Sequence, residues 1–262
     1  MHTLYIYKKE KKKMKQLLKN NLKFLIFLTI FGLVGGYFTA LYTVQSLEQN
    51  LINEAIEELG SIDALIIITT FQSLVYALIL GIIGKIIATK IGLWRKAILT
   101  KKGNIDLVMV TVLGGATFVL LDYLFFSNFS EVIKNSYTVK PTLEYIIASI
   151  TYGAVIEEVM LRLFFMSLIA LIIQRLSKKD TMNNKILIMA NIIAAILFAA
   201  GHLPATILTI GITPMILIRC FVMNGAFGLI FGYIYRKHGI HYAMLSHGGV
   251  HIVSKLIWIL FI

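Results

Sequence analysis

The sequence has few charged residues and a single cysteine. Charged side chains make up 15% of the 262 residues, against about 25% in an average soluble domain. Cys220 has no second cysteine to pair with, which excludes the internal disulfide framework of small secreted domains. So little charge also excludes a disordered chain, which needs many charges and few hydrophobic residues.

Hydrophobic residues take the place of the missing charges. They make up 58% of the chain, and the mean hydropathy is +0.82. A globular domain of this size cannot bury so large an apolar excess, because folding covers only part of the surface of a soluble domain. The composition therefore predicts an all-α polytopic membrane protein and excludes a soluble enzyme and a nucleic-acid-binding module.

Apolar stretches long enough to cross a bilayer as a helix, about 20 residues each, divide the chain. We count seven of them, at 22–44, 64–87, 106–126, 143–174, 186–210, 214–235 and 241–262. The fourth is longer than a simple span requires, and Pro204 interrupts the fifth. No repeat or linker divides the chain further. We therefore expect a basic tail over 1–23 and one transmembrane domain over 24–262.

The net charge of +12 lies mostly on one side of the predicted spans. Eight lysines oppose one glutamate in the first 23 residues, and Met14 is an alternative start of the chain. Basic loops stay in the cytoplasm, so we predict that the N-terminus is inside and the C-terminus outside. Only Lys134 and Lys140 then fall in outer loops. The charge indicates topology and contact with anionic lipid, and no nucleic-acid partner.

The predicted outer segment 45–63 is acidic. It carries five carboxylates and neither lysine nor arginine, and its hydrophobic residues recur at helical spacing. This pattern predicts an amphipathic helix at the membrane surface. A solvated acidic loop is the alternative.

The fourth predicted span carries three charges in its centre, where each costs about 2.5–3.5 kcal/mol on insertion scales. Glu158 and Arg162 are four residues apart with the acid first, the favourable order for an ion pair on a helix. We expect this pair to support the structure. Glu157 lies about 100° further round an α-helix and needs a partner from another part of the chain.

Histidines on two other spans supply candidates for that partner. His202 ends the motif Phe198-Ala199-Ala200-Gly201-His202 on the fifth span, while His247 and His251 are four apart on the seventh. A single histidine in a membrane helix is usually a packing residue with an interhelical hydrogen bond. The joint occurrence of these histidines with a mid-helix glutamate favours a catalytic site over separate structural roles.

Two kinds of hydrolytic chemistry fit these residues. A buried carboxylate can act as a general base for water beside a neutral histidine, and further histidines can donate hydrogen bonds to an oxyanion. Alternatively, Glu157, His202 and His247 are suitable zinc ligands that leave one position open for water. The residues alone leave this choice open.

Three motifs on separate spans resemble the CPBP family of intramembrane proteases, which includes CAAX prenyl endopeptidases and bacterial Abi or bacteriocin-processing proteins. The resemblance covers about 143–255. The motifs are Glu157-Glu158-x-x-x-Arg162, Phe198-x-x-x-His202, and a glycine-rich stretch over 225–235 that leads to His247. In the glycine-rich stretch, Gly228 and Gly232 form a small-x-x-x-small face that lets helices approach closely.

The resemblance implies roles for the site residues. Glu157 and His202 would activate water, and His247 with the residue four positions later would complete the site as metal ligand or oxyanion support. The family's usual Asn or Asp at that last position is His251 here. The implied protein is a CAAX-type protease and metallopeptidase of a prokaryotic cell membrane, which cleaves a membrane-associated peptide or protein.

Two other classes of function stay open. A non-enzymatic protein of the same fold could confer immunity or sequester a peptide, and the substitution at His251 and the acidic outer segment motivate this alternative. A proton- or cation-coupled transporter would also use buried Glu and His. It would normally show inverted repeats and interrupted helix pairs, and we find neither pattern in the sequence.

Overall fold

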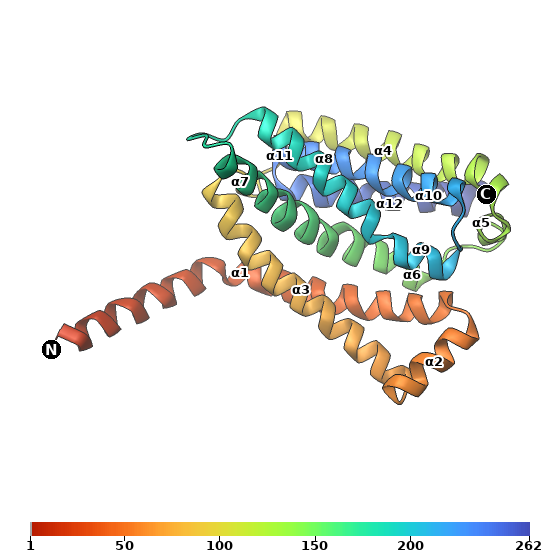
Figure 1. Cartoon of the computed structure of the whole chain (residues 1–262), viewed down its shortest axis with the longest axis horizontal. Coiled ribbons are helices and arrows are strands. Elements are labelled where there is room, and N and C mark those ends of the chain that lie inside the picture. Colours follow the sequence, from red (N-terminus) through yellow and green to blue (C-terminus); the bar gives the residue numbers. More distant parts are fainter. Residues whose placement is uncertain (1) are drawn as a thin grey trace.

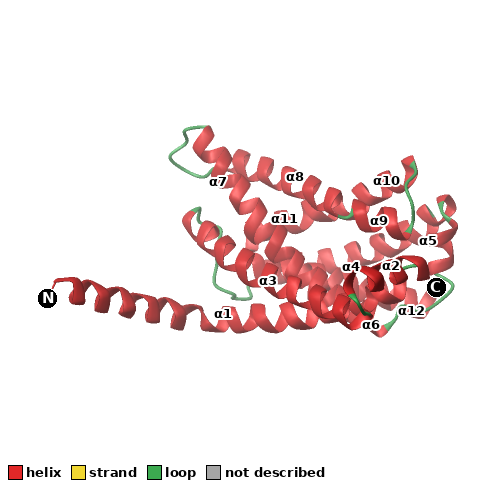
Figure 2. Ribbon diagram, turned by 60° about the horizontal axis from the view of Figure 1, so that its bottom comes forward, coloured by secondary structure: helices red, strands yellow, loops and turns green. Residues whose placement is uncertain are grey.

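The protein, seen here as a computed structural model, is described over residues 2–262, with side chains from residue 21 onwards. Most lysines of the basic tail and the two alternative starts, Met1 and Met14, lie outside the described side chains. The described residues form helices and no strand, which confirms the all-α class (Figures 1 and 2).

The first half of the fold is a helical hairpin followed by a third long helix. Its elements are α1 (His2–Ser46), α2 (Gln49–Leu59), α3 (Ile62–Lys90), α4 (Lys101–Leu124), η1 (Phe126–Phe129) and α5 (Glu131–Ser136). Side-chain oxygens of Ser61 and Thr100 accept hydrogen bonds from the first turns of α3 and α4. These caps satisfy backbone amides that would otherwise lack partners and fix where each helix begins.

The second half holds the shorter and less regular elements. They are α6 (Leu143–Ala148), η2 (Ser149–Glu157), η3 (Val159–Met166), α7 (Ser167–Leu176), α8 (Asn184–Gly201), α9 (Leu203–Thr209), α10 (Pro214–Cys220), η4 (Phe221–Ala226), α11 (Phe227–His238) and α12 (Ile240–Phe261). The fifth predicted span is interrupted as expected, because α8 ends at Gly201 and Pro204 lies in the first turn of α9.

Six helical stretches among the described residues are long and apolar enough to cross a membrane. They are Asn21–Ser46, Ile62–Lys90, Lys101–Phe129, Asn184–Thr209, Pro214–His238 and Ile240–Phe261. The helix that runs from Leu143 to Leu176 is not one of these six. A membrane-spanning helical fold is thus confirmed, while the number of seven spans and their orientation stay predictions.

The acidic segment between α1 and α3 forms the helix α2. Ile52 is buried, whereas Glu54, Glu57 and Glu58 are exposed. The segment is therefore an amphipathic helix and not a solvated acidic loop, while its position at the membrane surface stays a prediction.

The helix from Leu143 to Leu176 contains two π-helical segments, η2 and η3, on either side of Glu158. A π-helix closes its hydrogen bonds from i to i+5, so its turns are wider than those of an α-helix, and such turns are frequent at functional sites. The prediction of a regular α-helix here was wrong in this respect. The side chains of Glu157 and Glu158 therefore lie on a wider turn than the α-helical turn from which their relative positions were predicted.

This central helix lies between two groups of helices. The pair α1 and α3 packs on one side of it, and α4, α8, α11 and α12 gather on the other, as Figure 1 shows. The predicted glycine face of α11 packs on α8, because a Cβ at Gly228 would lie 3.2 Å from backbone of Ala195, and one at Gly232 would overlap Asn191. The end of α8 also lies near the middle of α12, where the ring centres of Phe198 and His247 are 6.4 Å apart.

Candidate active site

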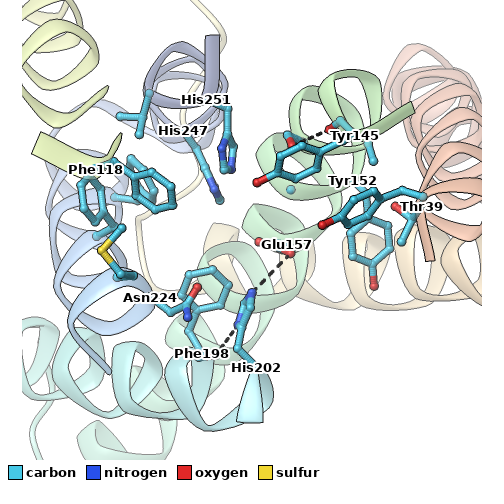
Figure 3. A pocket seen from close by; sticks show the side chains of 18 residues that line it. Thr39, Phe118, Tyr145, Tyr152, Glu157, Phe198, His202, Asn224, His247 and His251 are labelled. Atoms are coloured by element: carbon cyan, nitrogen blue, oxygen red, sulfur yellow. Dashed lines mark hydrogen bonds and ion pairs between the residues drawn. The ribbon is translucent and has the colours of Figure 1, made fainter. Parts of the chain in front are cut away.

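All four residues predicted to be catalytic line one cavity of about 270 Å³. Glu157 comes from the end of η2, His202 from the end of α8, and His247 and His251 from the middle of α12 (Figure 3). Aromatic side chains form much of the remaining wall, as is common in ligand pockets. They are Tyr42, Phe118, Tyr145, Tyr152, Phe198, Phe227 and Phe231.

Glu157 and His202 face each other across a gap. The Oε1 atom of Glu157 lies 3.9 Å from Nε2 of His202, and both side chains are partly exposed. The Nδ1 atom of His202 lies 2.8 Å from the carbonyl oxygen of Phe198. A carbonyl can only accept, so Nδ1 carries the proton, and in the neutral ring Nε2 is an acceptor. Two acceptor atoms thus face each other with no donor between them, and their separation also exceeds hydrogen-bond distance.

The predicted pair of Glu158 and Arg162 is present and completely buried. Arg162 Nη1 lies 3.3 Å from Glu158 Oε1, and the two side chains are 2% and 0% exposed. Arg162 also donates to the carbonyl oxygen of Gly228 at 3.2 Å, and its guanidinium lies 4.6 Å from the ring centre of Phe198. These contacts join the central helix to α8 and α11 at the level of the cavity.

Glu158 has a second partner that the sequence did not predict. Its Oε1 atom accepts a hydrogen bond from Nδ1 of His247 at 2.9 Å. The sequence groups His247 with Glu157, whereas the structure places it in contact with the neighbouring glutamate. Phe231 stacks on the His247 ring at 4.3 Å between centres. His247 is therefore held in one orientation, with Nδ1 turned to Glu158 and the opposite edge of the ring left for the cavity.

His251 lies beside His247 in the same wall. The two rings are stacked with 4.9 Å between their centres, and Lys255 Nζ lies 3.5 Å from Nδ1 of His251. A Cβ at Gly153 on η2 would lie 3.5 Å from the other ring nitrogen, Nε2. His251, at the position where the family usually has Asn or Asp, thus lines the cavity with its Nε2 turned toward η2.

The placed residues do not form a metal-ligand set. Within the part of the chain that the structure describes, no three His, Cys, Asp or Glu side chains are grouped closely enough to hold a metal ion together. Of the predicted ligands Glu157, His202 and His247, the last already uses Nδ1 for Glu158. The zinc site therefore stays a prediction.

A second cluster of charged and aromatic residues lies next to the site and was missed by the sequence analysis. Arg219 on α10 forms two hydrogen bonds with Asp122 on α4, at 2.6 and 2.8 Å, and the hydroxyl of Tyr137 donates to Asp122 at 3.0 Å. The available signal was that Asp122 and Arg219 are opposite charges, each inside a predicted span. These residues line a second cavity of about 420 Å³.

Comparison with known proteins agrees with the motifs. Residues 139–253 match the family model described as Type II CAAX prenyl endopeptidase Rce1-like, and the four cavity residues all lie within this range. No curated protein and no solved structure matches the chain. Over residues 139–253 the chain is thus similar to the Rce1-like type II CAAX prenyl endopeptidases, and the resemblance to the CPBP family is confirmed.

Proposed function

We propose that the protein is an intramembrane endopeptidase that hydrolyses a peptide bond in a membrane-associated peptide or protein. The observation that carries the proposal is the gap between Glu157 and His202, where two acceptor atoms face each other at 3.9 Å inside a cavity. Support also comes from the similarity of residues 139–253 to CAAX prenyl endopeptidases.

The first step is activation of a water molecule in this gap. One water can donate one hydrogen to Glu157 and the other to Nε2 of His202, since a polar contact beyond 3.5 Å is often bridged by water. Glu157 then takes a proton as general base while the water oxygen attacks the carbonyl carbon. His202 keeps the water oriented, because its Nδ1 is fixed on the carbonyl oxygen of Phe198.

The second step is stabilisation of the oxyanion that forms on the carbonyl oxygen. When both ring nitrogens of His247 are protonated, Nδ1 donates to Glu158 and Nε2 is free to donate a hydrogen bond to the oxyanion. Its Nε2 can then donate toward the cavity, and Nε2 of His251 lines the same wall. Collapse of the intermediate breaks the carbon–nitrogen bond, and Glu157 returns the proton to the leaving amine.

Glu158 and Arg162 are positioning residues in this scheme. Arg162 forms a fully buried ion pair with Glu158, and Glu158 in turn holds His247. Neither residue needs to touch the substrate.

The test is cleavage by purified protein in detergent, with a library of membrane-associated peptides analysed by mass spectrometry. We expect Glu157→Gln and His202→Ala each to lower cleavage by at least about 100-fold, since general acid–base groups contribute roughly 10²–10⁴-fold. Glu54→Gln, on the exposed face of α2, is the matched control and should retain full activity. Full activity in both site variants would overturn the proposal.

The same assay separates the two versions of the chemistry. Cleavage that resists a chelator supports water activated by Glu157 and His202 alone. Cleavage that the chelator abolishes, and that added zinc restores, supports a metal held by Glu157, His202 and His247.

A non-enzymatic peptide-binding or immunity protein is the second candidate, favoured by His251 at a position where the family usually has Asn or Asp. It predicts that peptide binding or protection persists in Glu157→Gln. Loss of protection in that variant, with normal amounts of folded protein, would contradict it.

A further inference from the structure

Lys255 on α12 is a buried lysine that the proposed chemistry does not use. Its side chain is 4% exposed, yet none of the described acidic side chains forms an ion pair with it. Its Nζ atom lies 4.1 Å from the ring centre of Tyr145 and 3.5 Å from Nδ1 of His251. A buried charge without a counterion is costly, so such residues usually serve a ligand or a transported ion.

The second cavity, which Lys255 lines, has no free carboxylate to pair with this lysine. Its one carboxylate, on Asp122, is occupied by two hydrogen bonds from Arg219 and one from Tyr137. Asp122 and Arg219 therefore balance each other and leave Lys255 unbalanced. Lys140 adds a further positive charge to the lining. The cavity thus suits an anionic group more than a neutral or cationic one.

The second cavity adjoins the candidate active site. Tyr42, Phe118 and Tyr145 line both cavities. His251 lines the first and Lys255 the second, and these two side chains are in contact. A peptide whose scissile bond lies beside Glu157 can therefore extend past Tyr145 and bring a later residue to Lys255.

We propose that Lys255 binds a carboxylate of the substrate on the far side of the scissile bond. This inference rests on the proposed peptidase function and names a specificity-determining subsite for it. A peptide can supply the carboxylate in two ways, from its own C-terminus or from an Asp or Glu side chain close to the cleaved bond. Tyr137 and Trp258, also in the lining, give apolar surface to the flanking residues.

The test uses one peptide that the wild-type protein cleaves, made in three forms. The first has a free C-terminal carboxylate, the second a C-terminal amide, and the third has amides in place of the acidic side chains after the cleaved bond. We expect one of the two altered forms to raise KM by about 10-fold or more, since charge-assisted hydrogen bonds are about twice as strong as neutral ones. The altered form that does so identifies the source of the carboxylate.

Variants then assign the effect to Lys255. In Lys255→Met we expect all three forms to be cleaved with the same raised KM, while Lys255→Arg keeps part of the discrimination. Lys134→Met, an exposed lysine outside both cavities, should behave as wild type. A fall in kcat that is equal for the three forms in Lys255→Met would instead assign its effect to the contact with His251 and overturn the proposal.

The comparison of the three peptides in the wild-type protein needs no variant to fold. Equal KM values for all three forms in that protein would also overturn the carboxylate subsite while leaving the peptidase proposal intact. If the wild-type protein cleaves no peptide, the peptidase proposal fails. In that case, binding of the acidic and amidated forms to the wild-type protein and to Lys255→Met still decides whether Lys255 selects a carboxylate. Equal binding of the two forms to the wild-type protein would overturn the carboxylate subsite.

Discussion

Two ion pairs, one fully and one partly buried, lie beside the two cavities, and they are built differently. Glu158 and Arg162 are neighbours on one helix, and the glutamate shares one oxygen between Arg162 and His247. Asp122 and Arg219 are 97 residues apart on α4 and α10, and they meet through two short, parallel hydrogen bonds. In the first pair the acid also binds His247, a candidate catalytic residue. In the second pair the acid is fully occupied by Arg219 and Tyr137. One pair is suited to orient a side chain, and the other to brace two helices.

The largest difference between the pairs is expected when the acid of the first is removed. In Glu158→Gln, Arg162 becomes an unpaired charge that is 2% exposed, and His247 loses its anionic acceptor. We expect the free energy of unfolding in detergent micelles to fall by about 3–5 kcal/mol. Cleavage of a model peptide should fall as well, because His247 is no longer held.

A double variant separates these two effects. Glu158→Met with Arg162→Met removes both charges, and replacement of a buried pair by apolar residues of similar volume is often neutral or stabilising. We expect the free energy of unfolding to return close to that of wild type while cleavage stays low. Recovery of both stability and activity would show that the pair does not act through His247.

The second pair should affect stability without affecting chemistry. In Asp122→Asn, Arg219 and Tyr137 lose their charged acceptor, and Arg219 is 19% exposed, so water can replace part of the interaction. We expect a loss of about 1–3 kcal/mol in the free energy of unfolding, with kcat unchanged for a peptide that lacks carboxylates after the cleaved bond. A fall in kcat comparable with that of Glu158→Gln would remove the distinction between the pairs.

The same contrast explains what the sequence could and could not predict. Glu158 and Arg162 could be paired because their spacing of four places them on one helix face, and the long apolar runs located the helices. The contact between Asp122 and Arg219 depends on how α4 and α10 pack, which hydropathy does not encode. The contact between His247 and Glu158 depends in addition on the π-helical turns of η2 and η3, which no residue spacing predicted.

The packing around the first pair provides the smallest and most local prediction. Gly228 lies where its carbonyl accepts from Arg162, and a Cβ there would lie 3.2 Å from backbone of Ala195 and 3.3 Å from Arg162 Nη2. Backbone cannot give way as a flexible side chain can, so Gly228→Ala should cost about 1–2 kcal/mol through overpacking.

Gly225 is the matched control on the same face of the chain. A Cβ at this position would lie 3.6 Å from the Cβ of Ala199, which is an ordinary contact. Gly225→Ala should therefore change the free energy of unfolding by no more than about 0.5 kcal/mol, since alanine fills space that is already available and favours helix. If the two variants were equally stable, the close approach of α11 to α8 would not constrain Arg162. The position of Glu158, and through it that of His247, would then depend on the central helix alone.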